Sequence, residues 1–148
     1  MYFSTMIVDY SNRPVRLTRE INDLVGKPFS IKMRFLLKGI GSHRMKIEKS
    51  SKEIFLKLSK FQNIKYGSVE LRPKGILVHF KDNLIHYVWV IPYYKLMLYQ
   101  TDYDCIHAEG NYISFNKKSL KQTNTKFFKK LNHLKTEYVD KHYGGGPN

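Results

Sequence analysis

The stretch from Tyr66 to Asn116 constrains the fold of this chain more than any other feature. Glycine, proline and an Asp-Asn pair interrupt it, and the runs between them are rich in β-branched and aromatic residues, as half-buried strands are. Short connections favour antiparallel neighbours, because parallel strands need long crossovers. The stretch therefore predicts a curled antiparallel sheet or partly open barrel of about six strands: Ser68–Arg72, Ile76–Lys81, Leu84–Ile91, Tyr94–Gln100, Tyr103–Ala108 and Asn111–Phe115.

The residue types within these strands also predict their faces and ends. The run after Gly75 alternates, so one face should carry Ile76, Val78 and Phe80 and the other Leu77, His79 and Lys81. The next strand is apolar on both faces, which indicates a central strand covered on both sides. Pro92 removes a ladder donor and should end that strand or place a bulge there. Glu109-Gly110 should turn the last hairpin.

The N-terminal segment, residues 1–62, is expected to be a mainly helical layer. Thr18 is a plausible N-cap for a helix from Arg19 to Val25, which Gly26-Lys27-Pro28 would end. Residues 29–48 fit both helical and strand periods. Residues 42–61 favour a helix, although a strand at Met45–Ile47 is an alternative.

A C-terminal helix is expected over residues 124–142, with Asn124 or Thr125 as its N-cap. Its apolar stripe comprises Phe127, Leu131, Leu134 and Tyr138. The last residues, 144–148, lack core-forming side chains and should be a flexible tail. The 148 residues thus predict one α+β domain over residues 1–143, with a strand core at 66–116.

The net charge of +14 lies entirely in the two segments that flank the strand core. Residues 27–60 hold ten basic residues against two acids, and residues 116–148 hold eight lysines against two acids, while the other segments are neutral. Such a field attracts an anionic partner, which could be an acidic lipid surface, a nucleic acid or an acidic protein, or it could only solvate the surface. The candidate anion-binding residues are Lys49, Lys52, Lys57, Lys60, Lys126, Lys129 and Lys130. If they are functional, they should form one continuous basic face.

Catalytic and metal signatures are absent from the sequence. The six histidines show no zinc-like spacing, and no nucleophile motif or phosphate-binding loop is present, so we expect no enzyme, metal site or cofactor. The enzyme alternative would place acid–base chemistry on His79, His86 or His107 beside a carboxylate in one cleft. The single cysteine, Cys105, is expected to be a small buried hydrophobe. A signal peptide and a run of about 20 apolar residues are both lacking, which predicts a cytoplasmic protein.

The pattern over residues 66–142 resembles the pleckstrin-homology-like superfold in its small bacterial form. The likeness lies in the central strand Leu84–Ile91, its Ile91-Pro92 step, the hairpin Tyr103–Phe115 and the C-terminal helix stripe. It implies a sheet closed at one end by that helix. It also implies a binding module, because members of the superfold bind phosphoinositides, peptides or proteins and few are enzymes. Nucleic-acid binding and protein–protein interaction remain the alternatives.

Overall fold

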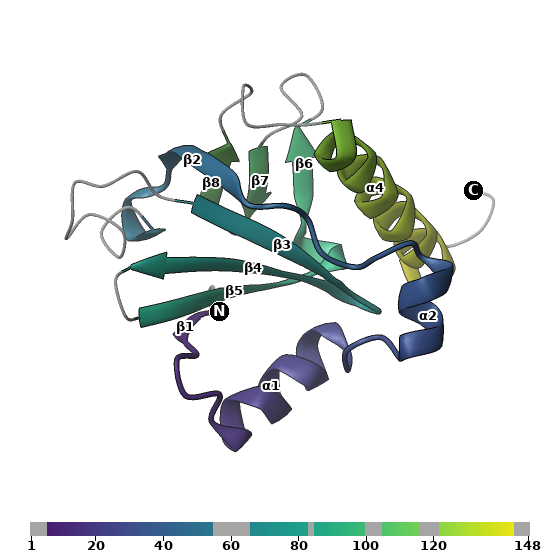
Figure 1. The fold of residues 1–148 in the computed structure, drawn as a ribbon, viewed down its shortest axis with the longest axis horizontal. Coiled ribbons are helices and arrows are strands. Elements are labelled where there is room, and N and C mark those ends of the chain that lie inside the picture. The colour runs from purple at the N-terminus through teal and green to yellow at the C-terminus, as the bar shows by residue number, and fades with distance from the viewer. Residues whose placement is uncertain (1–5, 55–65, 83–84, 100–104, 116–121, 144–148) are drawn as a thin grey trace.

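The computed structural model describes residues 6–54, 66–82, 85–99, 105–115 and 122–143, and it is an α+β fold built on one antiparallel sheet (Figure 1). The elements in chain order are β1 (Met6–Asp9), α1 (Val15–Val25), α2 (Ile31–Leu36), β2 (Met45–Ser50), β3 (Tyr66–Arg72), β4 (Gly75–Asp82), β5 (Ile85–Pro92), the 3₁₀ turn η1 (Tyr93–Lys95), β6 (Met97–Tyr99), β7 (Cys105–Ala108), β8 (Asn111–Phe115) and α4 (Gln122–Tyr143).

The sheet has eight strands in the order β1-β5-β4-β3-β2-β8-β7-β6, and each neighbouring pair is antiparallel. The ends β1 and β6 do not pair in the described part of the chain, so the sheet is open. The prediction of about six strands is wrong because two more come from the N-terminal segment. The curled antiparallel sheet and its C-terminal helix are confirmed.

Strand β2 lies where the sequence favoured a helix over residues 42–61. Met45 and Lys46 pair with β3, whereas Ile47, Lys49 and Ser50 pair with β8, with a register shift between Ile47 and Lys49. The free edges of β3 and β8 thus supply the hydrogen bonds that make this segment a strand, which a helical period further along the chain cannot outweigh. Met45 is fully buried. The alternative strand at Met45–Ile47 was therefore correct, and it extends to Ser50.

The starts of two helices also differ from the sequence prediction. Helix α1 begins at Val15, and the Thr18 hydroxyl donates back to the Pro14 carbonyl at 3.0 Å, so Thr18 does not cap it. Its end at Val25 is as predicted, with Gly26 at a φ of 89°. Residues 31–36 are helical. Helix α4 begins at Gln122, so the predicted cap residues 124 and 125 lie within it.

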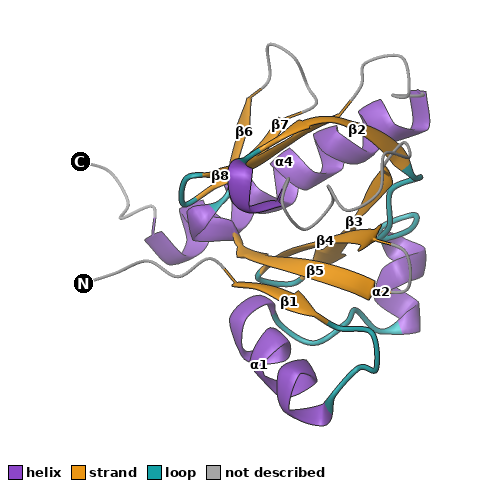
Figure 2. Cartoon of the chain, turned by 90° about the vertical axis from the view of Figure 1, so that its left-hand side faces the viewer, coloured by secondary structure: helices purple, strands orange, loops and turns teal. Residues whose placement is uncertain are grey.

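The inner face of the sheet carries the main core, over which α4 lies (Figure 2). Ile76, Val78 and Phe80 point into this core, as the alternation predicted. The predicted α4 stripe is confirmed: Phe127 and Leu131 are buried, and Leu134 and Tyr138 pack against the core half-buried. After Pro92 the chain first makes η1, so the strand expected from Tyr94 starts only at Met97. The predicted tail, 144–148, lies outside the described residues.

The outer face of the sheet carries a smaller core under α1. Ile21 and Val25 of this helix pack on Leu77, Val88 and Val90. Figure 2 shows α1 and α4 on opposite sides of β4 and β5, as expected for a central strand covered on both faces. Helix α1 covers only part of the outer face, and the part that it leaves open is polar.

Candidate functional site

A polar cleft of about 630 Å³ lies on the outer face of the sheet, beside α1. Three parts of the chain form its walls: strands β3–β5, the segment from β1 into α1, and the segment 28–42 that contains α2. Its lining residues are Tyr10, Arg13, Thr18, Asn22, Pro28, Arg34, Ile40, Gly41, Ser42, Ser68, Val69, Glu70, Arg72, Leu77, His79 and His86. Eleven of these carry a polar or charged side chain, which is unusual for a hollow formed beside a hydrophobic core.

A chain of hydrogen bonds crosses three strands along the floor of the cleft. Arg72 Nε donates to Glu70 Oε2 at 2.6 Å. The other carboxylate oxygen, Oε1, lies 2.9 Å from His79 Nε2. His79 Nδ1 lies 2.9 Å from His86 Nε2, and the two imidazole rings stack with centroids 5.1 Å apart. The result is one connected path from Arg72 to His86.

Strand register places these side chains together. Ser68 pairs with His79 across β3 and β4, and His79 pairs with Val88 across β4 and β5. Glu70 and His86 are each two residues from those direct partners, so they lie diagonally next to His79 on the same face. The short β3–β4 connection at Pro73-Lys74 holds this register.

The charge state of Glu70 follows from its surroundings. Burial alone would raise the pKa of this carboxyl, but the hydrogen bonds from His79 and Arg72, together with their charges, outweigh burial and lower the pKa from 4.5 to about 2. Glu70 is therefore ionised at neutral pH. An ionised carboxylate only accepts hydrogen bonds, so His79 must carry a proton on Nε2.

The surroundings of His86 disfavour its charged form. Burial lowers the pKa of His86, and the nearby charges of His79, Lys81 and Arg13 lower it further, while Asp9 opposes them. The contact between His79 Nδ1 and His86 Nε2 has room for one proton, which either ring can donate depending on its tautomer.

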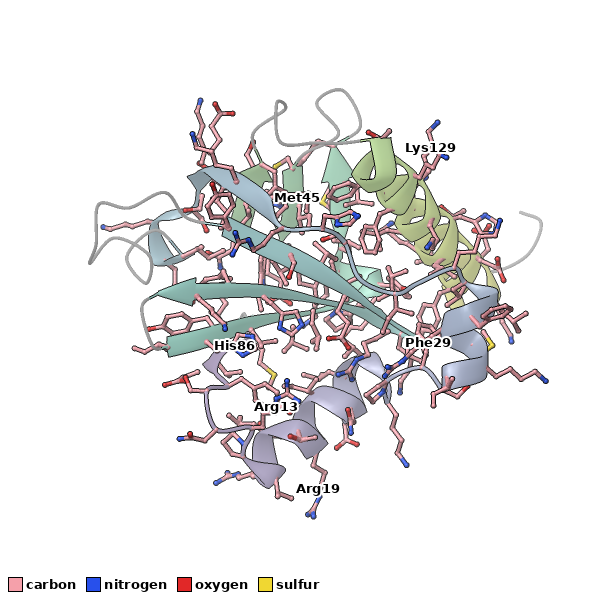
Figure 3. All side chains as sticks on the ribbon, in the orientation of Figure 1. Arg13, Arg19, Phe29, Met45, His86 and Lys129 are labelled. Atoms are coloured by element: carbon pink, nitrogen blue, oxygen red, sulfur yellow. The ribbon has the colours of Figure 1, made fainter. Side chains whose placement is uncertain are left out.

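The three arginines of the cleft have different roles. Arg72 is buried, and its Nη1 donates to Gly26 O at 2.8 Å and to Asn22 Oδ1 at 3.1 Å, so it fastens the end of α1 to β3. Arg13 and Arg34 are exposed at the rim. Arg13 follows β1 at a φ of 46° and lies near His86, as Figure 3 shows. The two exposed arginines are the ones available to a ligand.

The predicted lysines do not lie at this cleft. Lys49 and Lys52 are exposed on and just after β2, whereas Lys126 and Lys129 are exposed on α4. Figure 1 draws strands β6–β8 between β2 and the first turns of α4, so these two pairs lie apart. Lys130 instead has a structural contact, because its Nζ donates to the carbonyls of Gly39 at 2.9 Å and Lys38 at 3.4 Å. Lys57 and Lys60 lie outside the described residues.

Two of the three strand histidines converge, as the enzyme alternative required. His79 and His86 share the cleft with Glu70, whereas His107 on β7 stacks on Tyr112 with ring centroids 6.2 Å apart, away from the cleft. Within the described residues, no group of three or more histidine, cysteine or acidic side chains could hold a metal ion. Cys105 on β7 is half-buried, whereas the sequence predicted burial.

A second hollow, of about 430 Å³, lies at the other end of β5, where α1, β1 and β7 approach it. Its lining is mostly apolar, and its charged groups include the Lys95–Glu109 pair, with Nζ and Oε1 2.5 Å apart. Because the two charges of this ion pair neutralise each other, the polar cleft is the better candidate site.

Comparison with known proteins assigns no function to the cleft, so the cleft is interpreted from its chemistry. No family model, no curated protein and no solved structure matches the chain. Among the helices in the described ranges, none is long and apolar enough to cross a membrane.

Sequence reasoning missed Glu70, Arg72, Arg13 and Arg34 as site residues. The sequence identified the histidines but not their acid, because Glu70 lies in the middle of β3. A usable signal was present: the alternation of β3 puts Ser68, Glu70 and Arg72 on the face that His79 shares. The two arginines at the rim depend on how α1 and α2 fold back, which no local pattern specifies.

Proposed function

We propose that the protein is a non-enzymatic binding module whose polar cleft binds an anionic group of the phosphate class. One observation carries the proposal: the only carboxylate in the lining, Glu70, already accepts hydrogen bonds on both of its oxygens from Arg72 and His79. The lining holds three arginines against this one acid, a net charge of +2 when the histidines are neutral. Exposed Arg13 and Arg34 therefore present positive charge that no acid of the cleft offsets.

The neutral groups of the cleft add hydrogen-bonding capacity for such a ligand. The Ser68 hydroxyl and the Asn22 amide lie along its walls, whereas the hydroxyls of Thr18 and Ser42 already donate to the carbonyls of Pro14 and His43. An anion-binding pocket commonly combines a few fixed cations with such neutral donors, because the donors orient the group that the cations attract.

The pleckstrin-homology-like resemblance also supports a binding role. Strand β5 ends at the Ile91-Pro92 step, and α4 packs on the 3₁₀ turn that follows, with the rings of Tyr93 and Tyr138 5.6 Å apart. A meander of strands that ends in such a helix is what the resemblance implies. Fold likeness alone names no ligand, so the cleft chemistry carries the choice of an anion.

The test measures binding of inorganic pyrophosphate by calorimetry at low salt. Wild-type protein should bind it, and the double variant Arg13→Gln/Arg34→Gln should lose about tenfold or more in affinity, because each arginine can supply a charge-assisted hydrogen bond. Arg19→Gln is the matched control, since Arg19 is exposed on α1 and is absent from the cleft lining. Equal affinity of wild type and the double variant would refute the proposal.

Acid–base catalysis is a second candidate, and the Glu70–His79–His86 chain favours it. A carboxylate that fixes the proton of one histidine, which in turn orients a second, is how enzymes hold a general base in one tautomer. His86 would then be the base, because its lowered pKa keeps it neutral at physiological pH. Hydrolysis of p-nitrophenyl phosphate that His86→Gln abolishes, with pyrophosphate binding retained, would favour this candidate over the binding module.

A further inference from the structure

Helix α2 exposes apolar side chains that a globular protein ordinarily buries. Ile31 is 85% exposed, Phe35 is 83% exposed and Leu36 is 61% exposed. No residue of α2 is buried in the structure. These three side chains, which we call the α2 knob, lie within one side of the short helix, because positions 31 and 35 are one turn apart. A cluster of this kind indicates a surface that something else covers.

The α2 knob is held in place from both ends. Ser30 Oγ caps the helix by accepting from Met33 N at 3.2 Å. Phe29 before the helix and Ile40 after it pack half-buried against the main core. Lys130 of α4 donates to the Gly39 carbonyl at 2.9 Å. The knob is thus a fixed projection of the fold, at the edge of the molecule in Figure 1.

The sequence on either side of the knob is basic and contains no acid. The sequence has no aspartate or glutamate between Asp23 and Glu48, and it has six basic residues in that interval: Lys27, Lys32, Arg34, Lys38, Arg44 and Lys46. The first four of these are exposed. Exposed apolar and cationic side chains on one short helix match the boundary of an anionic bilayer, where acyl chains and acidic head groups meet.

Charge argues against other occupants. A second copy of this chain would bring another +14 against the same basic surface. A nucleic acid would match the lysines but would offer no apolar layer for Ile31 and Leu36. We propose that α2 binds the protein to an anionic lipid bilayer. The α2 knob would lie at the boundary between head groups and acyl chains, and the flanking cations would contact the acidic head groups. The proposal goes beyond the polar cleft, with which this surface shares only Arg34.

The experiment is co-sedimentation of the full chain with phosphatidylcholine vesicles, with and without about 30% phosphatidylserine. Wild-type protein should bind the acidic vesicles, more weakly as salt rises, and should leave neutral vesicles unbound. Ile31→Ser/Phe35→Ser should lower the partition coefficient about tenfold or more, because both side chains lose their burial in lipid. The fold should survive, since both side chains are exposed.

Two controls make the result specific. Val15→Ser removes an apolar side chain that is 73% exposed on α1, far from α2, and should bind as wild type does. Lys32→Gln/Lys38→Gln should weaken binding to the acidic vesicles only. Pyrophosphate binding by Ile31→Ser/Phe35→Ser should stay at the wild-type level, so a failure of the cleft proposal and a failure of this one give different results.

Several outcomes would overturn the membrane proposal. One is unchanged vesicle binding by Ile31→Ser/Phe35→Ser. Another is wild-type protein that does not bind acidic vesicles but binds duplex DNA at the same salt concentration. A third is a concentration-dependent dimer of the wild-type protein, measured by light scattering, that Ile31→Ser/Phe35→Ser abolishes. The α2 knob would then bind a second copy of the chain.

Discussion

Replacing Glu70 with glutamine tests the electrostatics of the polar cleft directly. The substitution keeps the size of the side chain and one acceptor oxygen but removes the charge that His79 and Arg72 stabilise. The folded-state pKa of Glu70 is about 2 and its ordinary value is 4.5, and a pKa difference is worth about 1.4 kcal/mol per unit, so ionised Glu70 contributes about 3–4 kcal/mol to stability. Glu70→Gln should lose that amount at neutral pH.

The sign of the pH dependence follows from the lowered pKa. Stability from Glu70 is present above pH 4.5 and is lost as the pH falls through about 2, so the difference between wild type and Glu70→Gln should shrink over that window. Urea unfolding followed by fluorescence of the buried Trp89, the single tryptophan, measures it. Glu48 is exposed on β2, so Glu48→Gln should change stability by less than about 0.5 kcal/mol. A difference that is absent at neutral pH, or that stays constant on acidification, refutes the reasoning.

Three further predictions concern packing and protonation. Gly75→Ala should cost about 3 kcal/mol or more, because a Cβ there would lie 2.3 Å from the Ile91 carbonyl oxygen, whereas Gly41→Ala, with its nearest atom 4.0 Å away, should be nearly neutral in the same urea assay. Leu131→Ala should cost about 2–5 kcal/mol because its side chain is fully buried, and a smaller loss would mean that α4 contributes little to the core. Burial and then nearby charges lower the pKa of His86 from 6.5, so the melting temperature should fall as the pH drops below 6.5. His86→Gln should reduce that fall. Parallel curves of melting temperature against pH for wild type and His86→Gln would contradict this prediction.

The strand core was predictable because its turns are local. Two residues with positive φ, Glu109 at 50° and Gly110 at 83°, form the tight hairpin that the sequence indicated. Alternation then assigned faces correctly along β4. These features depend on residues that are close in sequence, so a single sequence carries them.

Strand β2 could not be predicted in the same way. Its first residues pair with β3, which follows it, and its later residues pair with β8, more than sixty residues away. A segment that divides its hydrogen bonds between two distant strands has only a few alternating positions of its own. The sequence favoured a helix over the whole of residues 42–61, and tertiary pairing outweighed that preference over Met45–Ser50.

The basic face was a weaker prediction for a different reason. Net charge along a sequence does not say which lysines share a surface. The charge map pointed to residues 27–60, but the exposed cations beside the α2 knob, Lys32 and Lys38, were not among the candidate anion-binding residues. Lys130 was chosen, although its ammonium group contacts backbone carbonyls of residues 38 and 39.

The N-terminal segment determines what the outer face of the sheet can do. Arg72 holds the end of α1 at Asn22 and Gly26. Helix α1 therefore covers the apolar part of that face and leaves the side chains of Glu70 and His79 uncovered. The chain that continues from Gly26 then forms the opposite wall of the cleft and carries α2. The sheet supplies the acid and the histidines, while the N-terminal segment supplies Arg13, Arg34 and the apolar knob. The proposed anion site and the proposed membrane contact therefore both depend on this segment.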